Sequence, residues 1–135
     1  MDGGEPGLKN RNNMQKIDKV KREKALELLK GGSDSKLLTH LNACVRCGLC
    51  AGSCMFYIAH KESKYIPAKK VDLVSSVYRR YCTTMGKISP ALVNARELDD
   101  NMAEEMVDLL FGSCTMCGRC VKHCSIGVDI AYIVR

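Results

Sequence analysis

The feature that most constrains this chain is a cysteine pattern that occurs twice. Both copies read CxxCxxCxxxC, and they begin at Cys44 and Cys114, seventy residues apart. A [4Fe–4S] cluster needs four thiolates that approach it from different directions, and a CxxCxxC loop can supply three of them. The eight cysteines of the two patterns are Cys44, Cys47, Cys50, Cys54, Cys114, Cys117, Cys120 and Cys124. The sequence therefore predicts two [4Fe–4S] clusters as cofactors.

The fourth cysteine of each pattern decides how the two clusters are held. In two-cluster bacterial ferredoxins this cysteine ligates the cluster of the other motif. We therefore assign Cys44, Cys47, Cys50 and Cys124 to the first cluster, and Cys114, Cys117, Cys120 and Cys54 to the second. The loops also share a glycine after the second cysteine, Gly48 and Gly118, where positive φ would let amide groups face cluster sulfurs. The assignment of each fourth cysteine to the cluster of the other motif predicts two similar loops related by a pseudo-twofold axis.

Other uses of the cysteines fit the sequence less well. Zinc is the alternative metal, because CxxC pairs also form tetrahedral sites, but the third and fourth cysteines of each copy fit iron–sulfur ligation better. A disulfide framework would suit nine cysteines in a secreted chain. The first thirty residues hold no apolar segment of the export type, so we expect a reducing, cytoplasmic compartment. Cys82, the ninth cysteine, is interpreted as a buried structural thiol.

The apolar spacing of the rest of the chain predicts a mainly α fold. Helices are expected over 14–30, from a Ser33 cap to the first motif, from Pro67 to Tyr81, from Pro90, from Asp99 or Asp100 to Leu110, and over 128–134. Residues 1–13 are polar and glycine-rich, which predicts a disordered arm. Residues 14–135 are interpreted as one α-helical ferredoxin domain. The helix at 128–134 has no C-terminal cap, so this domain could continue beyond residue 135 in a longer protein. Aromatic residues make up only 5% of the chain, so its core should depend on the clusters.

Charge is distributed unevenly between two stretches of the chain. Residues 61–87 carry seven basic side chains against two acidic ones, whereas residues 97–108 carry six acidic side chains and no basic one. The simplest interpretation is two solvated helix faces, with Lys69 and Lys70 on the basic one. Opposite patches can also steer two different partners. The net charge of +6 falls to roughly +2 if each cluster with its thiolates carries about −2, and no aromatic-rich basic patch is present, so no nucleic-acid partner is expected.

The two motifs also carry a family resemblance. The segments CVRCGLCAGSC and CTMCGRCVKHC are joined by a linker that contains IPAKKVDLVSSVYRR. Together they resemble the helical two-cluster ferredoxin domain of heterodisulfide-reductase-like proteins, over roughly residues 35–135. The chain is similar both to the separate C-type subunit and to the amino-terminal ferredoxin domain of D-type or sulfite-reductase-associated K-type subunits.

This resemblance implies an electron relay. Electrons would arrive from a flavoprotein or an iron–sulfur donor, cross two clusters and leave to a CCG-type or other catalytic partner. No CCG segment follows Cys124, so we expect no catalytic residue here and interpret the chain as an electron-transfer component of an oxidoreductase complex. No run of eighteen apolar residues is present, which leaves peripheral association with a membrane complex open. The alternative function is an interaction module that the clusters staple together without a redox role.

Overall fold

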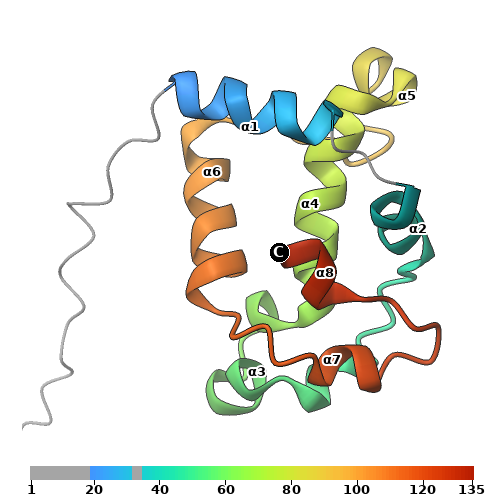
Figure 1. Cartoon of the computed structure of the whole chain (residues 1–135), viewed down its shortest axis with the longest axis vertical. Helices are drawn as coiled ribbons and strands as arrows, with labels where there is room; N and C mark the ends of the chain where they lie inside the picture. The colour runs from blue at the N-terminus through green and yellow to red at the C-terminus, as the bar shows by residue number, and fades with distance from the viewer. Residues whose placement is uncertain (1–18, 32–34) are drawn as a thin grey trace, which may run out of the picture.

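The computed structural model describes residues 19–31 and 35–135, and every regular element in these residues is a helix (Figure 1). In chain order the elements are α1 (Lys19–Gly31), α2 (Ser35–Ala43), η1 (Leu49–Ser53), α3 (Met55–His60), η2 (Ser63–Tyr65), α4 (Pro67–Cys82), α5 (Thr84–Ile88), α6 (Asp100–Met106), η3 (Val107–Gly112), α7 (Arg119–Lys122) and α8 (Ile130–Val134). The mainly α fold that the sequence predicts is confirmed. No helix in the described part of the chain has the length and apolar character needed to span a lipid bilayer.

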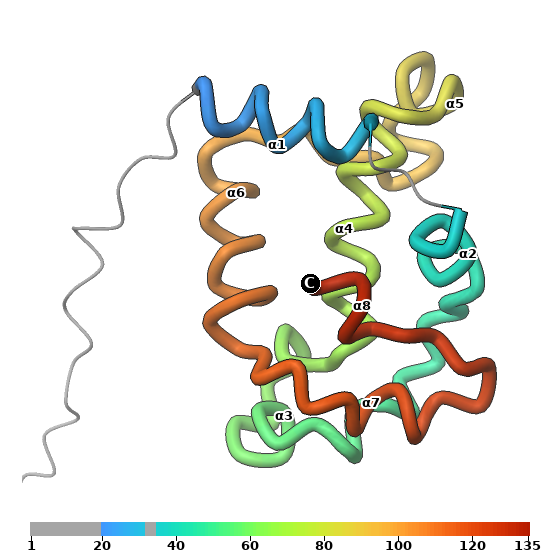
Figure 2. The backbone as a smooth tube through the Cα atoms, in the orientation of Figure 1, coloured from blue at the N-terminus to red at the C-terminus, as the bar shows by residue number. Residues whose placement is uncertain are grey.

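Helix α4 lies at the centre of the molecule, and α1, α2, α5, α6 and α8 all pack against it (Figure 1 and Figure 2). Pro67 occupies its first position, where the missing N–H of proline leaves no hydrogen bond unmade. Val71, Val74 and Val77 then recur on one face, and all three are buried. The helix predicted from Pro67 is therefore confirmed, and its valine face forms the middle of the core.

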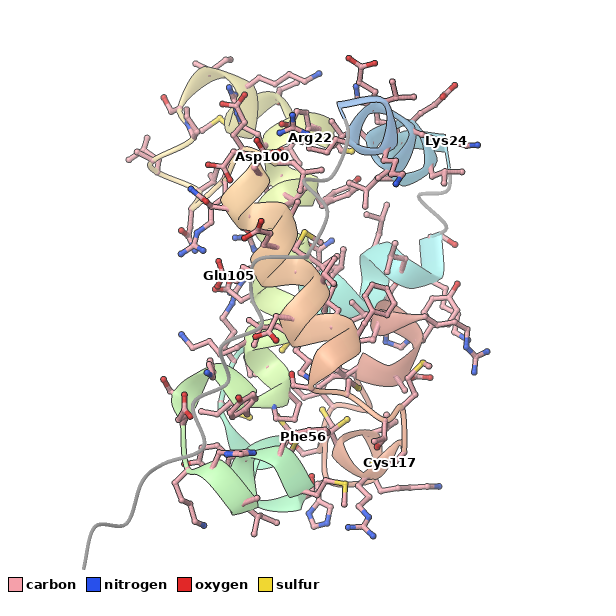
Figure 3. All side chains as sticks on the ribbon, turned by 90° about the vertical axis from the view of Figure 1, so that its left-hand side faces the viewer. Arg22, Lys24, Phe56, Asp100, Glu105 and Cys117 are labelled. Atoms are coloured by element: carbon pink, nitrogen blue, oxygen red, sulfur yellow. The ribbon has the colours of Figure 1, made fainter. Side chains whose placement is uncertain are left out.

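The core contains two clusters of buried side chains along α4. The first cluster, beside the cysteine loops, consists of Leu41, Cys50, Ala68, Val71, Val74, Leu110, Val128, Ile130, Ile133 and Val134. The second consists of Leu73, Val77, Met102 and Leu109, with Leu26 and Leu29 packed against it. An ion pair of 3.1 Å between Arg22 and Asp100 joins α1 to α6 at the end of the molecule that contains the second core cluster. Figure 3 shows this pair at one end of the molecule and Cys117 and Phe56 at the other.

The segment before the second motif forms α6 and then changes helix type. Asp99 caps α6, because its side chain accepts a hydrogen bond from the N–H of Met102 at 2.7 Å. This confirms the predicted helix start. Helix α6 then runs directly into η3, a π-helix that the sequence pattern did not predict. Leu109 packs in the second core cluster and Leu110 in the first, so η3 links the two parts of the core.

The helix predicted from Pro90 is wrong. Residues 90–94 form turns, and long-range hydrogen bonds tie this part of the chain to α4. The Arg79 side chain donates to the carbonyl of Val93 at 3.1 Å, and the N–H of Arg96 donates to the carbonyl of Ser76 at 3.2 Å. These tertiary bonds replace the local helix that the Ser-Pro sequence favoured.

The apolar face of α1 also differs in part from the expectation. Leu26 and Leu29 pack against the second core cluster, whereas Val20 and Leu28 are exposed. Helix α1 crosses one end of α4 and α6, so only a narrow stripe of its surface contacts them (Figure 1). The expected helix start at residue 14, the Ser33 cap and the arm over 1–13 lie outside the described residues.

Candidate iron–sulfur cluster sites

The two cysteine motifs fold into loops with matching backbones. Arg46 and Met116 both adopt the left-handed conformation, with φ of 56° and 52°. Gly48 and Gly118 do so as well, with φ of 80° and 71°. A short helical turn comes next in both loops, η1 in the first and α7 in the second. The seventy-residue repeat of the sequence is therefore also a repeat of backbone conformation.

Glycine is favoured at positions 48 and 118 by the positive φ of the backbone, and not by a lack of space for a side chain. A Cβ at either position would meet nothing within 4 Å, but side chains rarely tolerate this positive φ. Each glycine carbonyl accepts a hydrogen bond from the residue three positions on, from Ala51 at 2.9 Å and from Val121 at 3.1 Å. The glycines thus begin the helical turn that carries the third cysteine of each motif.

The eight motif cysteines line two cavities at the end of the molecule where α3 and α7 lie (Figure 1). The first cavity is lined by Cys44, Cys47, Cys50 and Cys124, and the second by Cys54, Cys114, Cys117 and Cys120. Each cavity receives three cysteines from one motif and the fourth cysteine from the other. This is the grouping that crossed ligation requires, although the ligand assignment itself stays a prediction.

The spread of the thiols suits a cluster better than a single ion. A zinc site needs four donors at about 2.3 Å from one point. Among the described residues, no group of three or more His, Cys, Asp or Glu side chains converges closely enough to hold one metal ion. A cubane instead takes its four thiolates around the outside of a cube, as four cysteines around a cavity would provide. The donor set therefore fits a [4Fe–4S] cluster in each cavity.

The first turn of α4 lies between the two cavities. Ala68 lines the first cavity, whereas Pro67 and Lys70 line the second. Ile130, the first residue of α8, lines both. The two cavities are therefore neighbours that share a wall built from α4 and α8.

Comparison with protein families supports the same conclusion from outside the structure. The profile of the 4Fe-4S dicluster domain family matches residues 40–128, a range that contains all eight motif cysteines. This chain belongs to the 4Fe-4S dicluster domain family. Its cofactors are two [4Fe–4S] clusters, as the cysteine spacing predicted.

The matched relatives of this dicluster domain are much longer proteins. The Hdr-like menaquinol oxidoreductase iron-sulfur subunit 2 of Archaeoglobus fulgidus and the corresponding iron-sulfur subunit of Archaeoglobus profundus are each 39% identical over 94 residues, or 70% of this chain. A subunit of the dihydromethanophenazine:CoB–CoM heterodisulfide reductase of Methanosarcina barkeri is 30% identical over 96 residues, or 71% of this chain. The matched part is 17% of each Archaeoglobus subunit and 22% of the Methanosarcina subunit. The resemblance to heterodisulfide-reductase-like proteins is confirmed. No solved structure matches the chain.

In the first cavity of the dicluster domain, backbone amides donate to cysteine sulfurs. Burial raises the pKa of Cys50, and a hydrogen bond from the backbone of Ala68 acts in the opposite direction. Ala68 lies in the first turn of α4, where N–H groups have no acceptor within the helix. The N–H of Val128 donates to the sulfur of Cys124 at 3.3 Å. Such bonds favour the more negative, reduced state of a bound cluster.

The second cavity has the same kind of bonds. The N–H of Met116 donates to the sulfur of Cys114 at 3.4 Å, and a backbone hydrogen bond from Arg119 lowers the pKa of Cys117. Burial, reinforced by the charges of Cys114 and Cys50, raises the pKa of Cys120 to about 11. Cluster ligands must be thiolates, so iron binding has to stabilise Cys120 in its deprotonated form. The effect of Cys50, which belongs to the other motif, reflects the closeness of the two cavities.

Lys70 is the residue of the site that sequence reasoning misplaced. The charge pattern of residues 61–87 predicts a solvated face, and for Lys70 this prediction is wrong, because only 2% of the residue is exposed. The pattern did contain a signal. Position 70 lies three residues after Pro67 and four before Val74, which are both on the buried face of α4. The spacing therefore favours a buried position, whereas the charge of a lysine favours an exposed one.

Cys82 and His123 lie outside the cavities. Cys82, at the end of α4, lines neither cavity, and it is half-buried. Burial raises the pKa of its thiol. His123 is exposed although it precedes Cys124. Neither residue therefore belongs to the two cavities that the eight motif cysteines line.

Proposed function

We propose that this chain transfers electrons through two [4Fe–4S] clusters as a component of a heterodisulfide-reductase-like redox complex. The observation that carries the proposal is the pair of neighbouring four-cysteine cavities, which share the wall made by Ala68, Lys70 and Ile130. Each [4Fe–4S] cluster supplies one-electron redox chemistry without making or breaking a covalent bond of a substrate. We assign Cys44, Cys47, Cys50 and Cys124 to the first cluster and Cys54, Cys114, Cys117 and Cys120 to the second.

The protein around the cysteines would hold the clusters rigidly and limit their contact with water. Leu41, Leu110 and Val128 are buried in the core cluster against which Cys44, Cys114, Cys120 and Cys124 pack. Close packing of this kind reduces reorganisation of the surroundings when charge changes, and it keeps the local dielectric low. The amide donors to the sulfurs are fixed in advance by the loop and helix backbones.

The surface beside the cavities supports docking of protein partners. Val45 and Ile126, which line the first cavity, are 66% and 53% exposed, and Met116, which lines the second, is 51% exposed. Exposed apolar side chains that gather at a functional site mark protein interaction surfaces. We propose a flavoprotein or iron–sulfur donor and a CCG-type catalytic acceptor as the partners. The complex would be cytoplasmic, with peripheral association with a membrane if its partners are membrane-bound.

Metal analysis and redox titration of the anaerobically purified chain test this function. We expect about eight iron and eight sulfide per chain and uptake of about two electrons, one per cluster. A Cys82→Ser variant is the control, and its iron content should match that of the parent. Two zinc ions per chain with no visible absorption would contradict the proposal. Clusters that are present but cannot be reduced by a strong one-electron donor would favour the stapled interaction module instead.

A further inference from the structure

The second cavity contains a buried positive charge. Lys70 lines this cavity, and its ammonium group donates to the backbone carbonyl of Ser113 and, at 3.2 Å, to the Ser113 hydroxyl. Ser113 is itself buried and immediately precedes Cys114. Helix α4 therefore carries an ammonium group into the wall of the second cavity, beside the cysteines of the second motif.

A buried ammonium needs a negative partner, because moving an unpaired charge out of water costs a great deal of free energy. Across residues 19–31 and 35–135, no carboxylate lies within ion-pairing distance of Lys70. Burial lowers the pKa of Lys70, and the negative charges of Cys114, Cys54 and Cys120 offset this lowering only in part. All three cysteines line the second cavity. The thiolates of a cluster bound in that cavity would supply the negative charge that balances the ammonium.

The first cavity has a different charge environment. Arg46 is the only charged residue of the described chain that lines it. Its guanidinium contacts the carboxylate of Asp72 at 2.7 Å, and both side chains are partly exposed. The α4 residue that faces this cavity is Ala68, which has no charge. The positive charge at the first cavity is thus neutralised and in contact with water. Two basic residues line the second cavity, the exposed Arg119 and the buried Lys70, and of these only Lys70 is withdrawn from water.

We propose that Lys70 gives the cluster of the second cavity a higher reduction potential than that of the first, so that electrons collect at the second site. This inference rests on the function and ligand assignment proposed above. Reduction adds one negative charge beside the ammonium, and opposite charges attract strongly where water is excluded. One electron leaves the first site and is taken up at the second, and no bond or proton needs to move.

A purely structural role for Lys70 makes a different prediction. Its hydrogen bonds to Ser113 hold the end of η3 against α4, so loss of the side chain would lower stability in either case. A structural role alone would leave the difference between the two potentials unchanged. The potentials therefore separate the two roles, and the stability of the variant does not.

The experiment is a redox titration of the anaerobically purified holoprotein, followed by electron paramagnetic resonance. In Lys70→Met we expect the higher of the two midpoint potentials to fall, with reduction at that site at least about tenfold less favourable, or about 59 mV for a one-electron couple. Lys70→Arg, which keeps the charge, should retain most of the difference. Lys69→Met is the matched control, because Lys69 is the exposed neighbour, and it should leave both potentials unchanged. Unchanged potentials in Lys70→Met would overturn the proposal, as would an equal fall of both.

A second measurement tests the order of the two potentials even if Lys70→Met loses its clusters. Cys117 and Cys47 are equivalent exposed cysteines of the second and first cavities. In variants that keep Lys70, Cys117→Ser should alter the signal with the higher potential and Cys47→Ser the signal with the lower one. The reverse assignment would overturn the proposed role of Lys70 while leaving the electron-transfer function intact. A parent chain without two reducible clusters would overturn that function, and the role of Lys70 with it.

Discussion

The loop of the first motif and the loop of the second share a backbone but differ in their electrostatic surroundings. Left-handed residues occur at equivalent positions, 46 and 116, then 48 and 118, and a helical turn follows in each. Around this common frame, the first cavity has Ala68 and the paired Arg46, and the second has the exposed Arg119 and the buried Lys70. The repeated cysteine spacing thus fixes how a cluster is wrapped. The unrepeated residues are free to make the two sites unequal.

The difference has a simple geometric cause. Two equivalent loops can be related by a twofold axis, but α4 is a single helix that enters between them. Its successive side chains point in different directions, so Ala68 faces one cavity and Lys70 the other. A single helix between two similar sites must therefore break their symmetry. In this chain it does so with a charge.

Removal of both clusters should have the largest effect on the two loops. Chelation of the iron should abolish much of the helical circular dichroism, because the first core cluster includes Cys50 and packs against four other motif cysteines. Far-ultraviolet circular dichroism before and after anaerobic chelation measures this loss. Cys82→Ser should behave like the parent in the same assay. Full retention of the helix signal after chelation would mean that the loops fold without their metal.

Substitution of either fourth cysteine, Cys54 or Cys124, should have the next largest effect. These substitutions test which cluster each cysteine ligates. Cys54→Ser should perturb the cluster of Cys114, Cys117 and Cys120, and Cys124→Ser should perturb the other, since each lines the opposite cavity. Each variant should lose up to about half of its iron. Mössbauer spectra and iron analysis report which cluster is altered. Damage confined to the motif that carries the substitution would refute crossed ligation.

Alanine at the two equivalent glycines should have a moderate and equal effect. Gly48→Ala and Gly118→Ala should each lower the free energy of unfolding by about 1–2 kcal/mol, because alanine is strained at positive φ. Anaerobic denaturation of the holoprotein measures the change. Gly52→Ala is the control, since Gly52 has room for a Cβ and does not have a positive φ, and it should cost little. A cost at only one of the two loops would show that their backbones are not equivalent.

Loss of the Arg46 partner should have the smallest effect. Asp72→Asn should cost less than about 1 kcal/mol of stability, because the ion pair is partly exposed. It should also leave the Arg46 charge unneutralised, so the lower of the two potentials should rise and approach the higher one. Glu62→Gln, which breaks the more exposed pair with Lys64, is the control and should not move either potential. A fall in the lower potential would contradict the charge difference between the two cavities.

Local signals in the sequence predicted those parts of the molecule that local chemistry decides. The cysteine spacing gave the cofactors, Pro67 and its valines gave α4, and Asp99 gave the start of α6. Tertiary contacts overrode local signals elsewhere. The segment after Pro90 bonds to α4 instead of forming a helix, because the Arg79 side chain donates to the Val93 carbonyl and the Ser76 carbonyl accepts from the Arg96 N–H. Lys70 was misjudged because a charged residue is seldom buried, and the thiolates that face it lie 16 or more residues away in sequence.

The central claim is that one chain holds two reducible clusters close together through crossed cysteines. The most direct test is electron paramagnetic resonance of the fully reduced parent chain under anaerobic conditions. We predict a spectrum with spin–spin coupling between the two clusters, since their cavities share the wall formed by α4 and α8. The coupling should disappear in Cys54→Ser, whose second cluster is impaired. Two independent, uncoupled signals in the parent chain would contradict the account.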